Sequence, residues 1–239
     1  MTGLVAAITF LTRVPLPVSA APAAGMLPWF PVVGALIGLT GALTFVAASL
    51  VVQPALAAAL AIAATILLTG ALHEDGLADA TDAWGGGRTR EEALRILRDP
   101  THGTYGVLAL ILSVVVRVVA LSALAPAIAV GALVAVHATS RGLLVGMIWS
   151  TRPARDDGLA AALSVGLPQA IVGVGAAAAL GIALMGPSFL AAAVVAVAAG
   201  GIVRWVAVRR IGGITGDVLG AAEQLAEVSV LVLLAATLG

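Results

Sequence analysis

Seven runs of apolar residues, separated by short polar or proline-containing breaks, constrain the fold of this chain more than any other feature. About 20 helical residues cross the hydrocarbon core of a bilayer, and each run is close to that length. The runs are continuous rather than alternating, which favours helices over a membrane β-barrel. We expect spans over residues 31–52, 55–72, 107–124, 128–149, 168–185, 188–208 and 218–238.

Composition supports the same fold class. Apolar residues make up 61% of the chain and charged residues 10%, whereas soluble domains average about 45–50% and about 25%. We therefore expect an all-α fold, a polytopic membrane helical bundle with about seven transmembrane helices (six to eight), formed by residues 1–239 as a single integral membrane domain. Residues 2–12 are too short to span and are predicted to form an interfacial or re-entrant start.

Residue types absent from the chain exclude several chemistries. There is no cysteine, which excludes disulfides, thiolate metal sites and a cysteine nucleophile. All twelve basic residues are arginine, so neither a Schiff-base lysine nor a P-loop lysine is available.

Charged residues gather on one side of the predicted bundle. The N-terminal segment and the connections 73–106, 150–167 and 209–217 hold nearly all of them, and the connections on the other side hold none. Because arginine marks the cytoplasmic side of membrane proteins, we predict that these three connections are cytoplasmic catalytic loops. This distribution favours a membrane-bound enzyme over a transporter, which places ionisable groups along a path through the bilayer.

Arg117 and Arg141 lie well inside the predicted third and fourth spans. A charge at the bilayer centre costs about 2.5–3.5 kcal/mol on insertion scales, so Arg117 and Arg141 need an anionic partner. That partner is either a ligand or a carboxylate in a structural ion pair, and snorkelling toward the interface is a further alternative. Glu223 and Glu227 lie one turn apart on the last span, and their expected partners are these arginines or a metal ion.

The segment between His73 and Asp99 contains seven of the twelve acidic residues. Asp75, Asp79 and Asp82 are spaced i, i+4 and i+7, which puts them on one face of a helix. Carboxylates so close together repel one another unless a cation lies between them, and oxygen ligands of this kind suit Mg²⁺ or Mn²⁺. The alternative is a solvated acidic helix end paired with neighbouring arginines. We favour the metal interpretation.

Two more polar segments come directly before predicted helices. The segment from Arg98 to Gly106 has the cation, hydroxyls and glycines of an anion site, although taken alone it is better explained as a helix start capped by Thr104. In the segment from Gly212 to Asp217, the aspartate is either a further metal ligand or an N-cap. Together these features indicate a magnesium-dependent transferase acting on a phosphorylated substrate at the membrane.

Five motifs resemble, in order and spacing, those of the adenosylcobinamide-GDP ribazoletransferase family. The resemblance covers essentially the whole chain. The motifs are Phe10-Leu11-Thr12-Arg13-Val14-Pro15-Leu16-Pro17, His73-Glu74-Asp75-Gly76-Leu77-Ala78-Asp79-Ala80-Thr81-Asp82, Arg98-Asp99 with Gly103-Thr104-Tyr105-Gly106, Ser140-Arg141-Gly142, and Gly213-Ile214-Thr215-Gly216-Asp217 with Gly220-Ala221-Ala222-Glu223.

The resemblance implies a late step of cobalamin synthesis. In that step α-ribazole, or its 5′-phosphate, attacks adenosylcobinamide-GDP and GMP leaves. It implies a multi-pass protein of the bacterial cytoplasmic membrane, with Mg²⁺ as cofactor and the active site facing the cytoplasm. The expected partners are these small molecules and the lipid bilayer, with no nucleic acid. The sequence leaves open a homo-oligomer or an association with other enzymes of the pathway.

The resemblance also implies roles for individual residues. Asp75, Asp79 and Asp82 would hold Mg²⁺ on the diphosphate, and Asp217 would complete or support the metal site. The base that takes the ribose hydroxyl proton is either His73 or an aspartate that does not bind metal. The expected substrate-binding residues are Arg13, Arg98, Asp99, Gly103, Thr104, Tyr105, Arg141, Thr215 and Glu223. The alternative functions are a related magnesium-dependent CDP-alcohol-type phosphotransferase and, less favoured, a membrane transporter.

Overall fold

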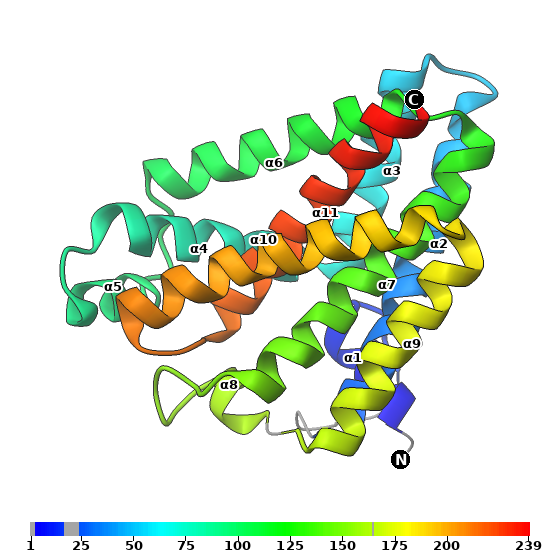
Figure 1. Ribbon diagram of the computed structural model, residues 1–239. Helices are drawn as coiled ribbons and strands as arrows, with labels where there is room; N and C mark the ends of the chain where they lie inside the picture. Colours follow the sequence, from blue (N-terminus) through cyan, green and yellow to red (C-terminus); the bar gives the residue numbers. More distant parts are fainter. Residues whose placement is uncertain (1–2, 17–23, 164) are drawn as a thin grey trace.

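The predicted all-α membrane bundle is confirmed. The computed structural model describes residues 3–16, 24–163 and 165–239, and this part of the chain is helical without a β-strand (Figure 1). Six of its helices are long and apolar enough to cross a membrane, and one bent pair of helices adds a seventh span if it is counted as one. The six are α2 (Phe30–Ser49), α6 (Thr104–Ser122), α7 (Pro126–Ser150), α9 (Leu167–Met185), α10 (Ser188–Ile211) and α11 (Gly216–Leu238).

The bent pair consists of α3 (Pro54–Thr69) and α4 (Leu72–Gly86), which meet at an angle of 90°. Gly70 and Ala71 make the bend, since both have left-handed backbone angles, with φ of 65° and 58°. The predicted second span, 55–72, is therefore shorter than expected, because the chain turns sharply at its end rather than leaving the bundle.

The connection predicted at 73–106 is not an open loop, and it contains the helix expected to carry Asp75, Asp79 and Asp82. Most of it is helical: α4 continues to Gly86, and α5 (Arg90–Ile96) follows after three residues. α5 begins with a capping box, in which Thr89 and Glu92 satisfy each other's backbone N–H groups. α4 buries small residues such as Ala78 and Ala80 on the side that packs against its neighbours, which explains why a segment with so many acids folds as a helix.

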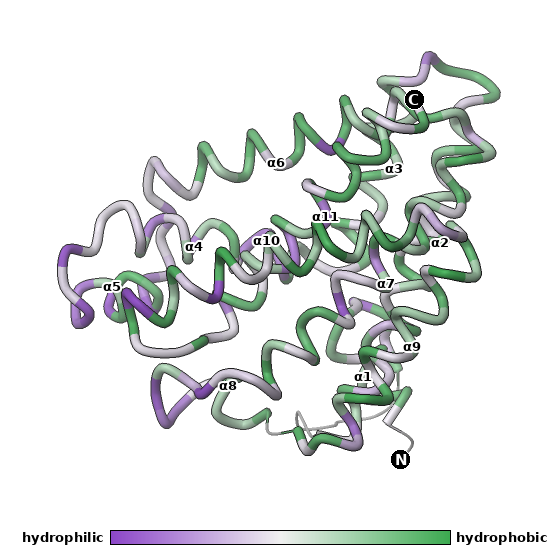
Figure 2. The backbone as a smooth tube through the Cα atoms, in the orientation of Figure 1, coloured by the Kyte–Doolittle hydropathy of each residue, from purple (hydrophilic) through white to green (hydrophobic). Residues whose placement is uncertain are grey.

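Central and peripheral helices differ in how much of their surface is covered. Within an apolar stretch of 18 residues, 67% of the residues are buried in α7 and in α11, whereas 22% are buried in α9. Large apolar side chains such as Leu112 on α6, Ile171 on α9 and Val197 on α10 are exposed. Figure 2 shows the resulting distribution, with hydrophobic colour over α6, α9 and α10 and hydrophilic colour around α5 and near α8 (Leu159–Ala162). The exposed apolar surface is the surface expected to face lipid.

The N-terminal segment forms a short helix, α1 (Gly3–Leu11), which packs against the 3₁₀ helix η1 (Ala24–Trp29) and against α2. Phe10 stacks on Phe30 with ring centroids 5.8 Å apart. Pro17, the last residue of the first motif, lies outside the described residues.

The polar connections meet at one end of the bundle, as their predicted common side requires. An isolated parallel bridge joins Pro153, after α7, to Ile214, before α11. The Ala154 N–H donates to the Ile214 carbonyl at 2.9 Å. Arg90 of α5 donates from Nη2 to the Ala154 carbonyl at 2.8 Å. Segments sixty or more residues apart in the sequence are thus held together by hydrogen bonds to backbone carbonyls.

Close packing of α2 against α7 depends on glycine. A Cβ at Gly38 would lie 2.8 Å from the Cα of Val134. We expect Gly38→Ala to lower the free energy of unfolding by about 1–3 kcal/mol, because the backbones must separate to admit the methyl group. Thermal unfolding of the purified protein in detergent measures this.

The matched control is Gly175→Ala on α9, where no atom lies within 4 Å of the added Cβ. It should melt at the wild-type temperature or slightly above it, since alanine favours helix over glycine. Equal melting temperatures for Gly38→Ala and Gly175→Ala would contradict the packing argument.

Candidate active site

The site begins where α4 crosses α11. A Cβ on Gly76 would lie 2.9 Å from the carbonyl oxygen of Asp217 and 3.1 Å from the Cα of Gly220. A Cβ on Gly220 would in turn lie 3.0 Å from the carbonyl oxygen of His73. Glycine at both positions therefore lets the two backbones touch, and this contact brings the first acids of α4 beside the first turn of α11.

Three carboxylates gather at this crossing, and we call Asp75, Asp79 and Asp217 the aspartate group. Asp79 lies within electrostatic reach of both other members. Its side chain is 16% exposed, whereas that of Asp75 is 65% exposed. The sequence predicted Asp217 as a metal ligand or an N-cap, and the N-cap alternative is wrong because Thr215 caps α11. Thr215 also donates from Oγ1 to Asp217 Oδ2 at 3.1 Å.

His102 lies over the aspartate group. Its Nδ1 is 3.3 Å from Asp79 Oδ1, and its Nε2 is 3.6 Å from Asp75 Oδ1. This histidine lies within the polar segment from Arg98 to Gly106, and nothing in the sequence predicted a role for it. Its position over Asp75 and Asp79 arises from a tertiary contact, because the connection before α6 folds back over α4.

The donor set of the aspartate group suits a hard cation. Mg²⁺ prefers oxygen ligands, commonly uses one or two carboxylates, and completes its shell with water and substrate phosphate. The ligand atoms of the three aspartates do not all lie within 4.8 Å of one another, since among the described residues only His137, Glu223 and Glu227 meet that limit. As placed, the group could therefore supply one or two direct carboxylate ligands to Mg²⁺, and water and substrate phosphate would have to supply the others.

Asp82 is engaged elsewhere, although its spacing puts it on the same helix face. Its Oδ2 accepts the N–H of Gly103 at 2.6 Å, and its Oδ1 accepts the N–H of Gly106 at 2.9 Å. Asp82 thus caps the start of α6, a role that the sequence argument had given to Thr104 as an ordinary helix start. The N-cap residue of α6 is Gly103, and its side-chain partner comes from α4.

The segment before α6 lines a cavity. Asp82, Asp99, His102, Gly103, Thr104 and Tyr105 all line a space of about 320 Å³. Asp99 accepts hydrogen bonds from the side chain and the backbone N–H of Thr101, which lower the pKa of the Asp99 carboxyl. Arg98 points to a different partner: its Nη2 donates to both oxygens of Asp157, at 2.9 and 3.1 Å.

Arg13 lies on the other side of Asp75. The two residues line a cavity of about 400 Å³ between the end of α1 and the bend between α3 and α4. The Arg13 N–H donates to the Leu68 carbonyl at 2.7 Å, which fixes the N-terminal motif to the end of α3. The first and second motifs of the sequence therefore share one cavity.

A third cavity, of about 160 Å³, lies at the helix crossing. His73, Asp75 and Asp217 line it, together with Arg155 from the connection after α7. The sequence showed Arg155 only as one charge of a polar connection. Its position beside Asp217 follows from the bridge between Pro153 and Ile214, which no local sequence signal announces.

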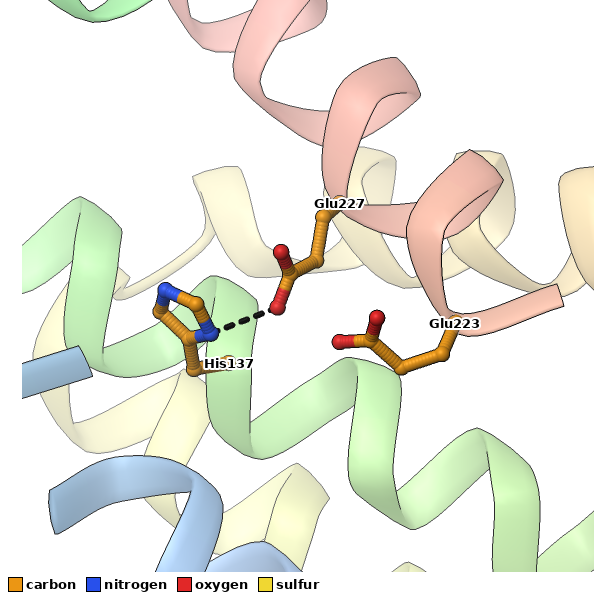
Figure 3. Close-up of side chains that lie close together, drawn as sticks. All are labelled: His137, Glu223 and Glu227. Carbon is orange, nitrogen blue, oxygen red and sulfur yellow. Dashed lines mark ion pairs between the residues drawn. The ribbon is translucent and has the colours of Figure 1, made fainter. Parts of the chain in front are cut away.

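The charged residues inside the bundle pair with one another. Arg117 Nη2 lies 3.2 Å from Glu74 Oε1, and Arg117 Nη1 lies 3.4 Å from Glu227 Oε2. Arg141 pairs with Glu223 and Glu227. Of the alternatives that the sequence left open for the two arginines, the structure shows the structural ion pair with carboxylates. We call these residues and His137, which Figure 3 shows paired with Glu227, the buried ion network.

Two predicted substrate-binding residues belong to this network. The side chains of Arg141 and Glu223 are 2% and 0% exposed. Both contact His73, whose Nδ1 lies 3.3 Å from Arg141 Nη2 and 3.7 Å from Glu223 Oε2. His73 therefore links the buried ion network to the cavity lined by Asp75 and Asp217.

Comparison with known proteins gives one consistent result. A family model described as cobalamin-5-phosphate synthase matches residues 3–235. Similar proteins include adenosylcobinamide-GDP ribazoletransferases from three bacteria. That of Bradyrhizobium diazoefficiens is 45% identical over 96% of this chain and 92% of its own. That of Mesorhizobium japonicum is 42% identical over 94% and 89%, and that of Ralstonia nicotianae 41% over 97% and 95%. No solved structure matches the chain.

The buried ion network should dominate stability. Arg117→Gln leaves Glu74 and Glu227 without their cation, and breaking a buried pair costs about 3–5 kcal/mol. We expect a large drop in melting temperature in detergent. Adding Glu74→Gln should recover part of the loss, because it removes one orphaned carboxylate.

Arg95→Gln on the exposed side of α5 serves as the control and should melt like wild type. If Arg117→Gln also melts like wild type, the ion pairs do not hold the bundle together.

Proposed function

Since this chain belongs to the cobalamin-5-phosphate synthase family, we propose that it joins α-ribazole, or its 5′-phosphate, to adenosylcobinamide-GDP and releases GMP. In this reaction a ribose hydroxyl oxygen of the acceptor forms a bond to the phosphorus next to cobinamide. The bond from that phosphorus to the GMP oxygen breaks, and the hydroxyl proton passes to a base. The product is adenosylcobalamin or its 5′-phosphate.

The observation that carries the proposal is that charged groups converge at one helix crossing. Carboxylates of the aspartate group lie there with Arg13 and Arg155, in two cavities that share Asp75. Displacement of GMP from a diphosphate needs a site that stabilises negative charge on both the leaving phosphate and the oxygens of the attacked phosphorus. Acids able to hold a cation beside arginines able to hold phosphate meet that need.

We assign the metal to Asp75, Asp79 and Asp217. When bound there, Mg²⁺ would supply positive charge to the diphosphate oxygens and to the departing GMP. Asp82 is left out of this set because both of its oxygens already accept backbone hydrogen bonds from the start of α6. Its contribution is to hold the α6 end of the site in place.

A proton acceptor must lie within reach of the ribose hydroxyl. The groups at hand are the aspartate group and two histidines, His73 inside the cavity at the crossing and His102 over its outer side. His73 is also held by Arg141 and Glu223, whereas His102 contacts only carboxylates of the aspartate group among its ion-pair partners in the described chain.

The proposed location is the bacterial cytoplasmic membrane, with the site facing the cytoplasm. The support is the arginine distribution: the connections at the site end carry arginine, whereas those at the opposite end carry no charge. Soluble substrates then reach the aspartate group from the compartment in which they are made.

Turnover by the purified full-length protein tests the function. We expect GMP to be released when the protein is incubated in detergent with Mg²⁺, adenosylcobinamide-GDP and α-ribazole 5′-phosphate. Omission of the acceptor is the control for simple hydrolysis. Folded protein that releases no GMP, or releases it equally without acceptor, would refute the proposal.

Substitutions in the aspartate group test the metal assignment. We expect Asp75→Asn and Asp79→Asn each to lower kcat at least about 100-fold, as loss of one electrostatic contributor at a reacting phosphorus typically does. Both should also weaken Mn²⁺ binding measured by electron paramagnetic resonance.

Two controls separate this effect from misfolding. Glu91→Gln, an exposed acid on α5, should leave kcat and Mn²⁺ binding unchanged. Asp82→Asn should lower the melting temperature, because the Asp82 oxygens cap α6. It should leave Mn²⁺ binding close to the wild-type level, because Asp82 is not one of the assigned ligands. Normal rates in Asp75→Asn or Asp79→Asn would remove that residue from the metal site.

A further inference from the structure

One nitrogen of Arg155 is buried without a hydrogen-bond partner. Among the described residues, its Nη1 is one of three such side-chain atoms, together with Trp84 Nε1 and Arg141 Nε. A buried donor on a charged group that stays unpaired is costly, and native proteins rarely leave one without a reason. Of the three, only the atom of Arg155 belongs to a residue that lines the cavity containing Asp75 and Asp217.

Another nitrogen of the Arg155 side chain already has a carboxylate partner. Its Nε lies 3.3 Å from Asp157 Oδ1, and Asp157 also receives both hydrogen bonds from Arg98. The backbone of the connection is fixed by the bridge from Pro153 to Ile214. One edge of the guanidinium is thus anchored on a carboxylate, and Nη1 remains available for a ligand.

Arg155 also separates two cavities of different charge. On one side is the cavity of about 160 Å³ with Asp75 and Asp217. On the other is an open, polar cavity of about 1090 Å³, in which four arginines face two aspartates. Its charged lining residues are Arg90, Arg98, Arg152, Arg155, Asp156 and Asp157. An anion that enters the outer cavity and approaches the aspartate group meets Arg155 between them.

We propose that Arg155 binds a nucleotide phosphate of the substrates and positions it between the outer cavity and the aspartate group. A guanidinium matches phosphate because its planar fork donates two parallel hydrogen bonds. Two substrates carry such a group: adenosylcobinamide-GDP in its diphosphate and α-ribazole 5′-phosphate in its monoester. The proposal rests on the proposed function for the identity of these ligands, but its test does not require turnover.

Equilibrium binding to the purified full-length protein provides the test, with GMP and α-ribazole 5′-phosphate as separate probes. Removing a hydrogen bond to a charged group should weaken binding of at least one probe about ten- to a hundredfold in Arg155→Gln. Arg155→Lys, which keeps the charge but not the fork, should lose less. Arg88→Gln, an exposed arginine before α5, is the matched control and should bind both probes like wild type.

The probe that is affected identifies the source of the phosphate. Weaker GMP binding in Arg155→Gln assigns Arg155 to the guanosine diphosphate part. Weaker α-ribazole 5′-phosphate binding, with an unchanged KM for unphosphorylated α-ribazole, assigns it to the acceptor. Unchanged binding of both probes overturns the proposal, as does wild-type protein that binds neither. If Arg155→Gln fails to fold, Arg155→Lys decides: binding of both probes at the wild-type level overturns the requirement for the fork.

If wild-type protein binds the probes but releases no GMP in the turnover assay, the proposed function fails and the assignment of Arg155 as a phosphate ligand stands. If turnover occurs and Arg155→Gln keeps wild-type binding and KM values, the proposed function stands and the assignment fails. The two conclusions are therefore tested separately.

Discussion

The buried ion network is the constraint on which the rest of the structure depends. It joins α4, α6, α7 and α11, since Glu74, Arg117, Arg141 and Glu227 come from four different helices. In an apolar interior each of these charges is costly without its partner. A helix that slides or rotates would separate the pairs and lower the free energy of unfolding. Apolar packing alone would tolerate many arrangements of such small-residue helices. The ion pairs select one of them and thereby fix the depth at which α4 enters the bundle.

The aspartate group follows from that selection. Glu74 and Asp75 are consecutive, and on a helix consecutive side chains point in different directions. When Glu74 pairs with Arg117 inside the bundle, Asp75 faces the cavities at the polar end, and its side chain is 65% exposed. Gly76 comes next, and its missing side chain lets α11 approach and bring Asp217 alongside. Three successive residues thus have three roles. Glu74 pairs with Arg117, Asp75 is a proposed metal ligand, and Gly76 lets α4 cross α11 closely.

The sequence predicted the parts of this arrangement that depend on local pattern. Hydropathy predicted the spans, and arginine placement predicted that the polar connections lie together. The 73–106 segment was predicted as a connection with its aspartates on one helix face, and the structure adds that its small residues pack α4 against α11 and α6. Spacing put Asp82 on the face of Asp75 and Asp79, but its partners, Gly103 and Gly106, are set by where α6 begins. Such partners depend on tertiary contacts that no local spacing contains.

Arg155 illustrates the same limit and also explains how the site can be rigid. Its position depends on backbone pairing between two connections and on Asp157, which is held by Arg98. Side chains fixed in this way lose little further freedom when a ligand arrives, which is the condition for electrostatic preorganisation. The aspartate group is held in place by α4 and α11, because the buried ion network joins these two helices inside the bundle. The ion-paired helices of the bundle therefore hold the charged side chains at its polar end more rigidly than surface loops alone would.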